Sequence, residues 1–288
     1  LDALMAKATP AQIWSIAETL ASQRRFDLAA RLGLKIFDDP AAVQHRGNQA
    51  LAVVQWILCS PDAEAHKEKT VALLKAIALQ PADSLEAPTF AAQRMLFFML
   101  PPRERSRWIE QMVRRGREPG ASPLWAALTE SLLFSLNGEH AKARTALQQL
   151  VALRPVAQTD APADERVWHF FLSTGLQFQS WGLHQAARAL WENTLSDEAA
   201  IALQGARASA SAQEIRVRLA ALSLARASRS EFRQQVLTLS REQSPHALLQ
   251  LAAILDAQGA AYEQALVLDT LHRLDGKIPL LRLLAACQ

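Results

Sequence analysis

Two residues in the middle of the sequence have a type and a spacing that suggest metal binding. Glu165 and His169 are four positions apart, so on a helix a carboxylate and an imidazole would lie on one face, within reach of a single ion. Two ligands hold a transition metal poorly, because protein sites for these ions use three or four. We therefore expect no metal site, and we expect His169 to lie at a helix-pairing surface or to face a partner.

The sequence contains none of the short motifs that mark common catalytic and cofactor sites. Its ten glycines form neither a GxGxxG nor a GxxxxGK phosphate loop, and no HExxH zinc motif, nucleophile elbow or SxxK pair occurs. Cys59 and Cys287 stand far apart with no metal or redox spacing, so each is expected to be a small buried hydrophobic residue. We expect a chain that is not itself an enzyme and that carries no cofactor.

The segment 103–117 combines a basic face with an apolar face. On a helix its apolar residues would lie together, and its arginines, with one glutamate, would line the opposite side. The apolar face consists of Trp108, Ile109, Met112 and Val113, and the polar stripe consists of Arg103, Arg107, Glu110, Arg114 and Arg117. The stripe is either a solvated helix face or a surface where planar guanidinium groups dock an acidic segment or a phosphate.

The composition indicates that helices position all of these side chains. Half of the residues are apolar and only 6% are aromatic, Ala and Leu are abundant, and strand-type runs of Val, Ile and Thr are missing. A formal net charge of +3, from 31 basic and 28 acidic residues, does not favour nucleic acid as a partner. The longest apolar runs, such as MLFFML at 95–100, are too short to span a membrane. We expect an all-α protein without a membrane span.

Prolines divide the chain into units of about forty residues, each long enough for two helices and short loops. Long helical patterns are followed by Pro40, Pro81, Pro119, Pro155, Pro245 and Pro279. New helices are expected to start at or after Pro10, Pro88, Pro123 and Pro162, since proline suits the first helical position. We expect residues 1–288 to form a single domain of about seven such units. A weak joint is expected near 203–213, where small residues dominate.

Four segments share a pattern of small, aromatic and large apolar residues at similar offsets. In 124–155, Ser131 and Phe134 precede a turn at Gly138, and Ala143, Leu147, Leu150 and Pro155 follow it. The segment 168–195 has Gly175, Phe178, a Trp181-Gly182 turn, Ala187 and Trp191 in the corresponding places, and 10–40 and 248–272 match in part. This pattern resembles the tetratricopeptide repeat, a helix–turn–helix unit. The resemblance implies a right-handed α-solenoid of about seven antiparallel helix hairpins, with Gly175 and Ala143 at close helix crossings.

The resemblance also implies which residues would face a partner. In tetratricopeptide domains the first helix of each pair lines the concave surface. The corresponding residues here are Trp14, Glu18, Trp125, His169 and Gln179. Most of the seven tryptophans are expected to be core residues between hairpins, whereas Trp14 and Trp125 would be partly exposed and able to anchor a peptide.

We therefore expect a non-catalytic helical-repeat scaffold that binds a peptide or a partner protein. The alternative is the accessory superhelix of an enzyme, such as a cell-wall enzyme, whose catalytic part lies outside this chain, or a superhelix that encloses a small molecule. The chain starts with Leu1 rather than Met and shows no signal peptide, so we expect a fragment of a larger protein. We expect a soluble protein, with the cytoplasm slightly favoured and the periplasm or secretion open if a signal was removed.

Overall fold

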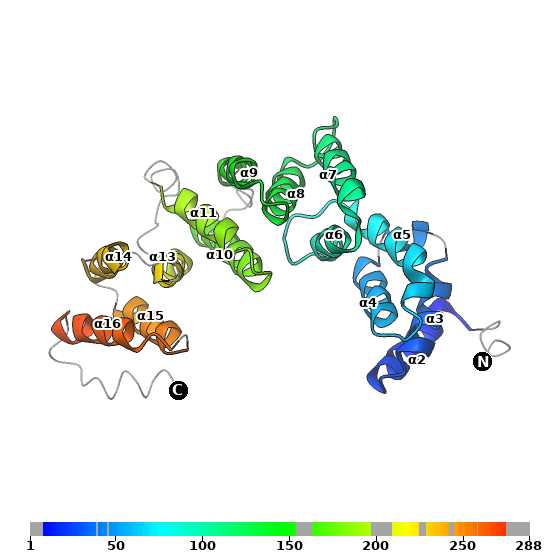
Figure 1. Cartoon of the computed structure of the whole chain (residues 1–288), viewed down its shortest axis with the longest axis horizontal. Coiled ribbons are helices and arrows are strands. Elements are labelled where there is room, and N and C mark those ends of the chain that lie inside the picture. The colour runs from blue at the N-terminus through cyan, green and yellow to red at the C-terminus, as the bar shows by residue number, and fades with distance from the viewer. Residues whose placement is uncertain are drawn as a thin grey trace. The chain divides into compact units, whose positions relative to one another are not determined.

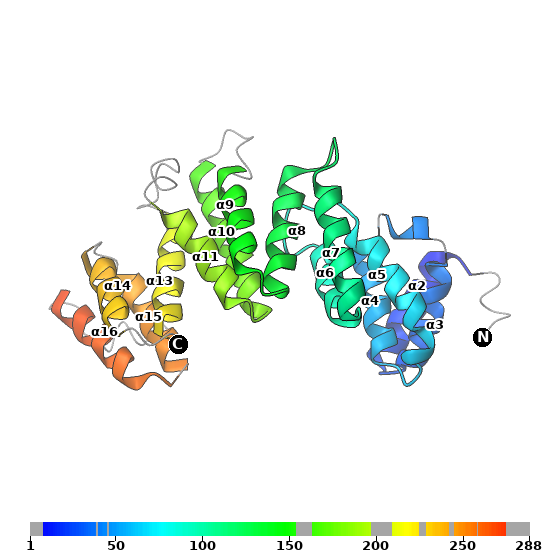
Figure 2. The same ribbon diagram turned by 45° about the horizontal axis from the view of Figure 1, so that its top comes forward.

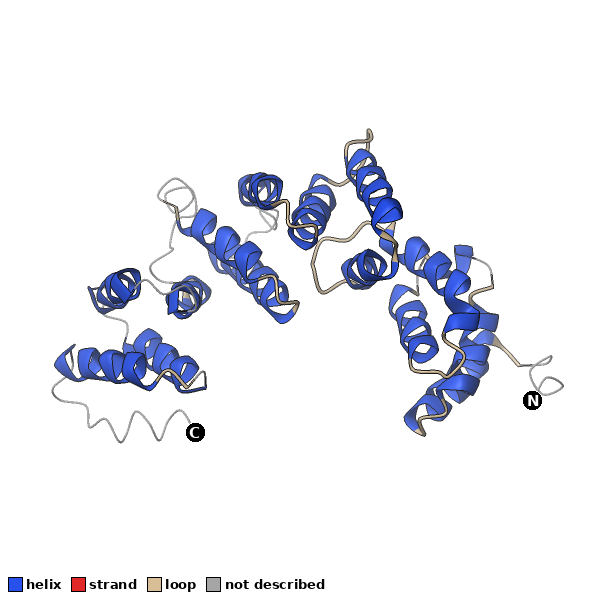
Figure 3. Cartoon of the chain, viewed as in Figure 1, coloured by secondary structure: helices blue, strands red, loops and turns tan. Residues whose placement is uncertain are grey.

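The computed structural model describes residues 8–38, 40–44, 46–153, 163–196, 209–224, 229–241, 245–257 and 259–274. Within these ranges the chain forms fourteen α-helices and two short 3-10 helices, joined by loops and turns, and contains no β-strand (Figure 3). The all-helical prediction is confirmed. None of the helices in the described ranges is both long enough and apolar enough to cross a bilayer.

Contacts between residues divide the chain into two compact units, Leu1–Ala146 and Leu147–Gln288, and the division falls inside α9 (His140–Leu153). The first unit contains α2 (Pro10–Ser22), α3 (Phe26–Ile36), α4 (Gly47–Leu58), α5 (Lys67–Ala78), α6 (Pro88–Met99), α7 (Pro102–Gly116) and α8 (Pro123–Leu136), with the 3-10 helices η1 (Pro40–Val43) and η2 (Glu64–His66). The second unit contains α10 (Ala163–Ser180), α11 (His184–Leu195), α13 (Ala210–Leu224), α14 (Arg229–Arg241), α15 (Pro245–Ala257) and α16 (Ala261–Leu274).

Most helices that follow one another in the chain pack against one another within each unit. In the first unit α2 packs on α3, α3 on α4, α4 on α5 and α5 on α6; in the second, α10 packs on α11 and α15 on α16 (Figures 1 and 2). A helix with one apolar stripe is unstable alone, so pairing buries the stripe. The predicted pairing is confirmed, and the continuation of these pairs into a right-handed superhelix stays a prediction.

Four of the pairs are joined by the same turn. Its second residue has a positive φ, which is 77° at Gly138, 76° at Gly182 and 69° at Gly259, and Arg24 has 60° between α2 and α3. In each turn the N–H of the following residue donates to a carbonyl five residues earlier, as when Leu183 donates to Phe178 at 2.8 Å. This bond closes a helix C-terminus by the Schellman motif. The four turns lie in the four segments that share the sequence pattern.

Prolines begin helices where the sequence predicts it. Pro10, Pro88 and Pro123 occupy the first position of α2, α6 and α8, where the missing N–H would have had no partner. Thr9 reinforces the start of α2 through a capping box with Gln12. The prediction at Pro162 falls outside the described residues.

Helices α10 and α11 cross most closely at Gly175. A Cβ atom placed there would lie 2.2 Å from Cε2 of Trp191, so no larger residue fits without movement. Trp191 is fully buried and its indole Nε1 donates to the carbonyl oxygen of Phe171 at 3.0 Å, which holds the ring against α10. The predicted close crossing at Gly175 is confirmed, and Ala143 is buried on α9.

The expectations for the cysteines and for the joint near 203–213 are not confirmed. Cys59 is exposed at the C-cap of α4, just beyond the last residue of the helix, so the prediction that it is buried is wrong. The weak joint near 203–213 falls partly on 203–208, outside the described residues, and residues from Ala210 onward belong to α13. Cys287 also lies outside the described residues.

Candidate functional site

Trp14 lies half-buried on α2, with its ring against another indole. The rings of Trp14 and Trp56 of α4 are stacked, with centroids 5.1 Å apart and planes inclined by 27°. Ala17, one turn later on α2, is fully buried against Leu32 of α3, which orients the helix. This stacking supports one face of the Trp14 ring and leaves part of the side chain accessible.

Trp14 borders a cavity in the first unit. Its volume is about 620 Å³, and it lies where α2, α4 and α6 begin. Its lining comprises Pro10, Ala11, Trp14, Gln44, Arg46, Gly47, Asn48, Gln49, Gln80 and Pro88. The volume falls within the range of about 300–1,000 Å³ that is typical of small-ligand sites.

Hydrogen bonds around Gln80 hold the walls of this cavity together. The side-chain Nε2 of Gln80 donates to the carbonyl oxygen of Val43 at 2.8 Å, and the carbonyl oxygen of Gln80 accepts from Oγ1 of Thr89 at 3.1 Å. A Cβ atom at Gly47 would lie 3.0 Å from Cγ of Pro88, so glycine allows α4 to begin this close to α6. The cavity is therefore built from three fixed helix starts.

The lining is rich in hydrogen-bonding groups and contains no carboxylate. The side-chain amides of Gln44, Asn48 and Gln49 each offer donors and an acceptor, and Arg46 is the one cation among the lining residues. In the first backbone hydrogen bond of α4, the N–H of Ala50 donates to the carbonyl oxygen of Arg46. The side chain of Arg46 makes no capping hydrogen bond at this helix start. The N–H groups of residues 47–49 thus have no partner within the described part of the chain.

The other candidates suggested by the resemblance do not join this cavity. Glu18 is exposed one turn beyond Trp14 on α2 and is not part of the lining. His169 is exposed and Gln179 half-buried, both on α10 of the second unit. Of the five candidates, Trp14 is the one that lines this cavity.

The expectation that Trp125 is partly exposed is wrong. Its side chain on α8 is only 3% exposed, and its indole N–H is buried without a hydrogen-bond partner among the described residues. The end of α7 covers it: a Cβ atom at Gly116 would lie 3.9 Å from Cζ3 of the Trp125 ring. Helix α7 packs on α8, and its apolar residues Trp108, Ile109 and Met112 are buried as predicted.

Arginines of the predicted stripe lie on the outer side of this helix pair. Arg103, Arg107 and Arg114 are exposed on α7. Arg117 is also exposed and its Nε lies 3.4 Å from Oε1 of Glu130. The stripe is therefore accessible, with one member already paired.

Glu165 makes a contact that the sequence did not suggest. Its Oε1 accepts hydrogen bonds from the Oγ of Ser211 at 2.7 Å and from the N–H of Ser211 at 3.2 Å, at the start of α13. Burial raises the pKa of the Glu165 carboxyl, but hydrogen bonds from Ser209 and Ser211, with nearby His169, hold the pKa below its ordinary value of 4.5. The carboxylate thus caps a helix, and no group of three or more potential ligands occurs in the described ranges.

Four polar residues of the Trp14 cavity were missed by sequence reasoning. Gln44, Arg46, Asn48 and Gln49 belong to a polar run, QHRGNQ, just before and at the start of α4. Such a run between two helices is ordinary in loops, and only its position beside Trp14 makes it a candidate site.

No family model matches this chain, and no curated protein is significantly similar to it in sequence. Its assignment to the tetratricopeptide family therefore remains a resemblance of pattern.

Proposed function

We propose that this chain is a non-catalytic scaffold whose first unit holds an extended peptide segment of a partner protein in the Trp14 cavity. The observation that carries the proposal is the stacked Trp14–Trp56 pair at the edge of an amide-lined cavity of about 620 Å³. An aromatic side chain supplies a large, rigid apolar contact, and such residues dominate the energetics of many interfaces.

The polar lining suits a peptide backbone better than a single charged group. An extended peptide presents N–H donors and C=O acceptors in alternation, and side-chain amides such as those of Gln44, Asn48 and Gln49 can pair with both. The N–H groups of residues 47–49, which have no partner among the described residues, add donors for carbonyl oxygens. The peptide would therefore place an apolar side chain on Trp14 and its backbone along the amides.

The proposal includes a continuous superhelix of helix pairs, as the resemblance implies. A single compact core of this length would have a radius of gyration of about 19 Å. Stacked pairs contact only their neighbours, so the body lengthens with each pair, and we expect about 22–26 Å for a monomer in solution scattering. A radius of gyration of about 19 Å would contradict the superhelix. The Trp14 cavity would then still be tested by its own binding experiment.

Selection from a random peptide library displayed on phage tests the binding site. Enriched peptides are then labelled and measured by fluorescence anisotropy against wild type and variants. Trp14→Ala should weaken binding by about tenfold or more, since loss of an aromatic anchor costs at least 2 kcal/mol at many interfaces. Asn48→Ala with Gln49→Ala should also weaken binding, and these substitutions near the helix start do not disturb the Trp56 stack.

Glu18→Ala is the matched control, because it is exposed on the same helix outside the cavity. Peptides that bind wild type, Trp14→Ala and the Asn48/Gln49 double variant equally would contradict the proposed site. A library that yields no enriched sequence on the folded protein would contradict peptide binding itself. The alternative role as an accessory to an enzyme outside this chain stays a prediction from the sequence.

A further inference from the structure

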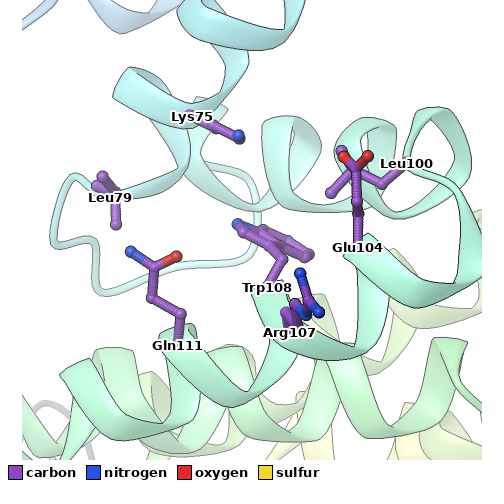
Figure 4. A pocket seen from close by; sticks show the side chains of 7 residues that line it. All are labelled: Lys75, Leu79, Leu100, Glu104, Arg107, Trp108 and Gln111. Carbon is purple, nitrogen blue, oxygen red and sulfur yellow. The ribbon is translucent and has the colours of Figure 1, made fainter.

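A second cavity opens between α5 and α7 of the first unit. Its volume is about 310 Å³, and its lining residues are Lys75, Leu79, Leu100, Glu104, Arg107, Trp108 and Gln111 (Figure 4). None of these residues lines the Trp14 cavity. In the view of Figure 4 the indole ring of Trp108 lies between the side chains of Lys75 and Arg107.

The connection between α6 and α7 explains why this space exists. Leu100 and Pro101 are both extended, with ψ of 139° and 152°, and Pro102 begins α7. Two consecutive prolines cannot form the tight, glycine-based turn that joins the four hairpins. Helix α7 therefore packs mainly on α8 instead of folding back along α6, and α5 packs on α6. The space between α5 and α7 stays open, with Trp108 and Leu100 as its apolar floor.

The charges at this cavity are unpaired. Lys75 and Arg107 are exposed on two different helices, and neither they nor Glu104 lies within ion-pair distance of an opposite charge among the described residues. Helix α7 carries five arginines against two glutamates, a net charge of +3, which equals that of the whole chain. One wall of the cavity is thus formed by a helix with an excess of positive charge.

We propose that the α5–α7 cavity binds an acidic segment of a partner protein, anchored by one apolar side chain over Trp108. Carboxylates on either side of the anchor would meet Lys75 and Arg107, and guanidinium groups suit carboxylates because their donors form a planar fork. The argument rests on charge complementarity and an apolar floor, and it does not depend on peptide binding at Trp14.

The same features disfavour the other anionic partners. A free phosphate would gain nothing from the apolar lining residues Leu79, Leu100 and Trp108, which are three of the seven. A nucleic acid carries a phosphate at every nucleotide, so one phosphate would lie near Glu104 and be repelled by its carboxylate. A peptide can place an amide or a lysine at that point instead.

A set of matched probes tests the proposal by fluorescence anisotropy on the full chain. The main probe is a short fluorescein-labelled peptide of aspartate and glutamate with a central phenylalanine. The second probe replaces phenylalanine by serine, and the third replaces the acids by their amides. A single-stranded oligonucleotide of equal charge and phosphatidylcholine vesicles with one fifth phosphatidylserine represent the other anionic partners.

We expect the main probe to bind wild type more tightly than any other probe. Lys75→Glu combined with Arg107→Glu should weaken its binding by about tenfold or more, because both changes reverse a charge at the cavity. Arg115→Glu is the matched control for Arg107→Glu alone: it makes the same charge change on an exposed position of α7 away from the cavity and should weaken binding less than twofold. Circular dichroism checks that the variants, with substitutions at exposed positions, keep their helices.

Four results would overturn the proposal. In the first, the main probe does not bind wild type. In the second, Arg115→Glu weakens binding of the main probe as much as Arg107→Glu does, which would indicate that the probe responds to the overall positive charge of α7 and not to the cavity. The serine probe binds as tightly as the phenylalanine probe, which would remove the role of Trp108. The oligonucleotide or the vesicles bind more tightly than the main probe. Trp14→Ala should leave this binding unchanged, so failure here and failure of the Trp14 site are distinguishable.

Discussion

At the residue scale, several side chains stabilise the fold by capping a helix end or by filling the space where two helices cross. Glu165, which has the spacing of a metal ligand with His169, instead accepts hydrogen bonds from the start of α13. Gly175 is needed because the Trp191 ring occupies the space where a side chain would lie. In both cases the partner is distant in sequence, and the role is structural.

The lowered pKa of Glu165 predicts a pH-dependent contribution to stability. Because the folded pKa lies below the ordinary value, the carboxylate stabilises the fold fully above that value, and the contribution is lost as pH falls through the folded pKa. Chemical unfolding between pH 3 and pH 7 should show wild type more stable than Glu165→Gln at neutral pH, with the difference shrinking below about pH 4.5. A difference independent of pH would contradict a role for the charge.

Gly175→Ala should destabilise the second unit. The added methyl group would meet the Trp191 ring, and overpacking of this kind costs about 1–3 kcal/mol. Urea unfolding measures the change. Ser180→Ala, an exposed change on the same helix, is the control and should alter stability little. An unchanged midpoint for Gly175→Ala would mean that α10 and α11 do not cross as described.

At the scale of elements, the helix pairs differ mainly in how they are joined. Four turns share a positive φ and the Schellman hydrogen bond, whereas the Pro101–Pro102 link leaves α7 free to pack on α8. The first kind of connection makes a closed hairpin, and the second leaves a cavity between neighbouring helices. The candidate acidic-segment site therefore depends on a connection that differs from those of the four hairpins.

Arg24→Gly should stabilise the first unit. Arg24 has φ 60° at the turn position where the other three hairpins have glycine, and a side chain is strained in that region. Relief of the strain, less the entropy cost of glycine, should raise the free energy of unfolding by about 0.5–1 kcal/mol. Gln23→Gly, where φ is −84°, should give no gain. Equal effects of the two substitutions in urea unfolding would contradict the shared turn.

At the scale of the whole molecule, contacts are local. Each helix packs mainly on helices near it in sequence, and contacts divide the chain into two compact units. Chains built in this way unfold in parts, because few interactions couple distant segments.

Hydrogen exchange tests this local organisation. In Gly175→Ala, exchange should become faster for amides of α10 and α11, while α2 and α3 of the first unit keep their protection. Mass spectrometry of peptic peptides distinguishes the two units. Uniformly faster exchange along the chain would indicate a single cooperative core instead.

The sequence by itself determined the helices, their starts at prolines, the glycine turns and the close crossing at Gly175. These features depend on backbone dihedral angles and on apolar spacing within about one helix pair, and both can be read from neighbouring residues. The buried face of α7, with Trp108, Ile109 and Met112, was predictable for the same reason.

Only the tertiary structure decided which of these side chains meet a neighbouring helix and which remain accessible. Trp14 and Trp125 both lie near the start of a helix, yet α7 covers Trp125, while Trp14 borders a cavity. Glu165 likewise caps α13 through Ser211, which lies 46 positions away in the sequence. Burial depends on the angle at which one helix crosses the next, and that angle results from packing between side chains far apart in the sequence.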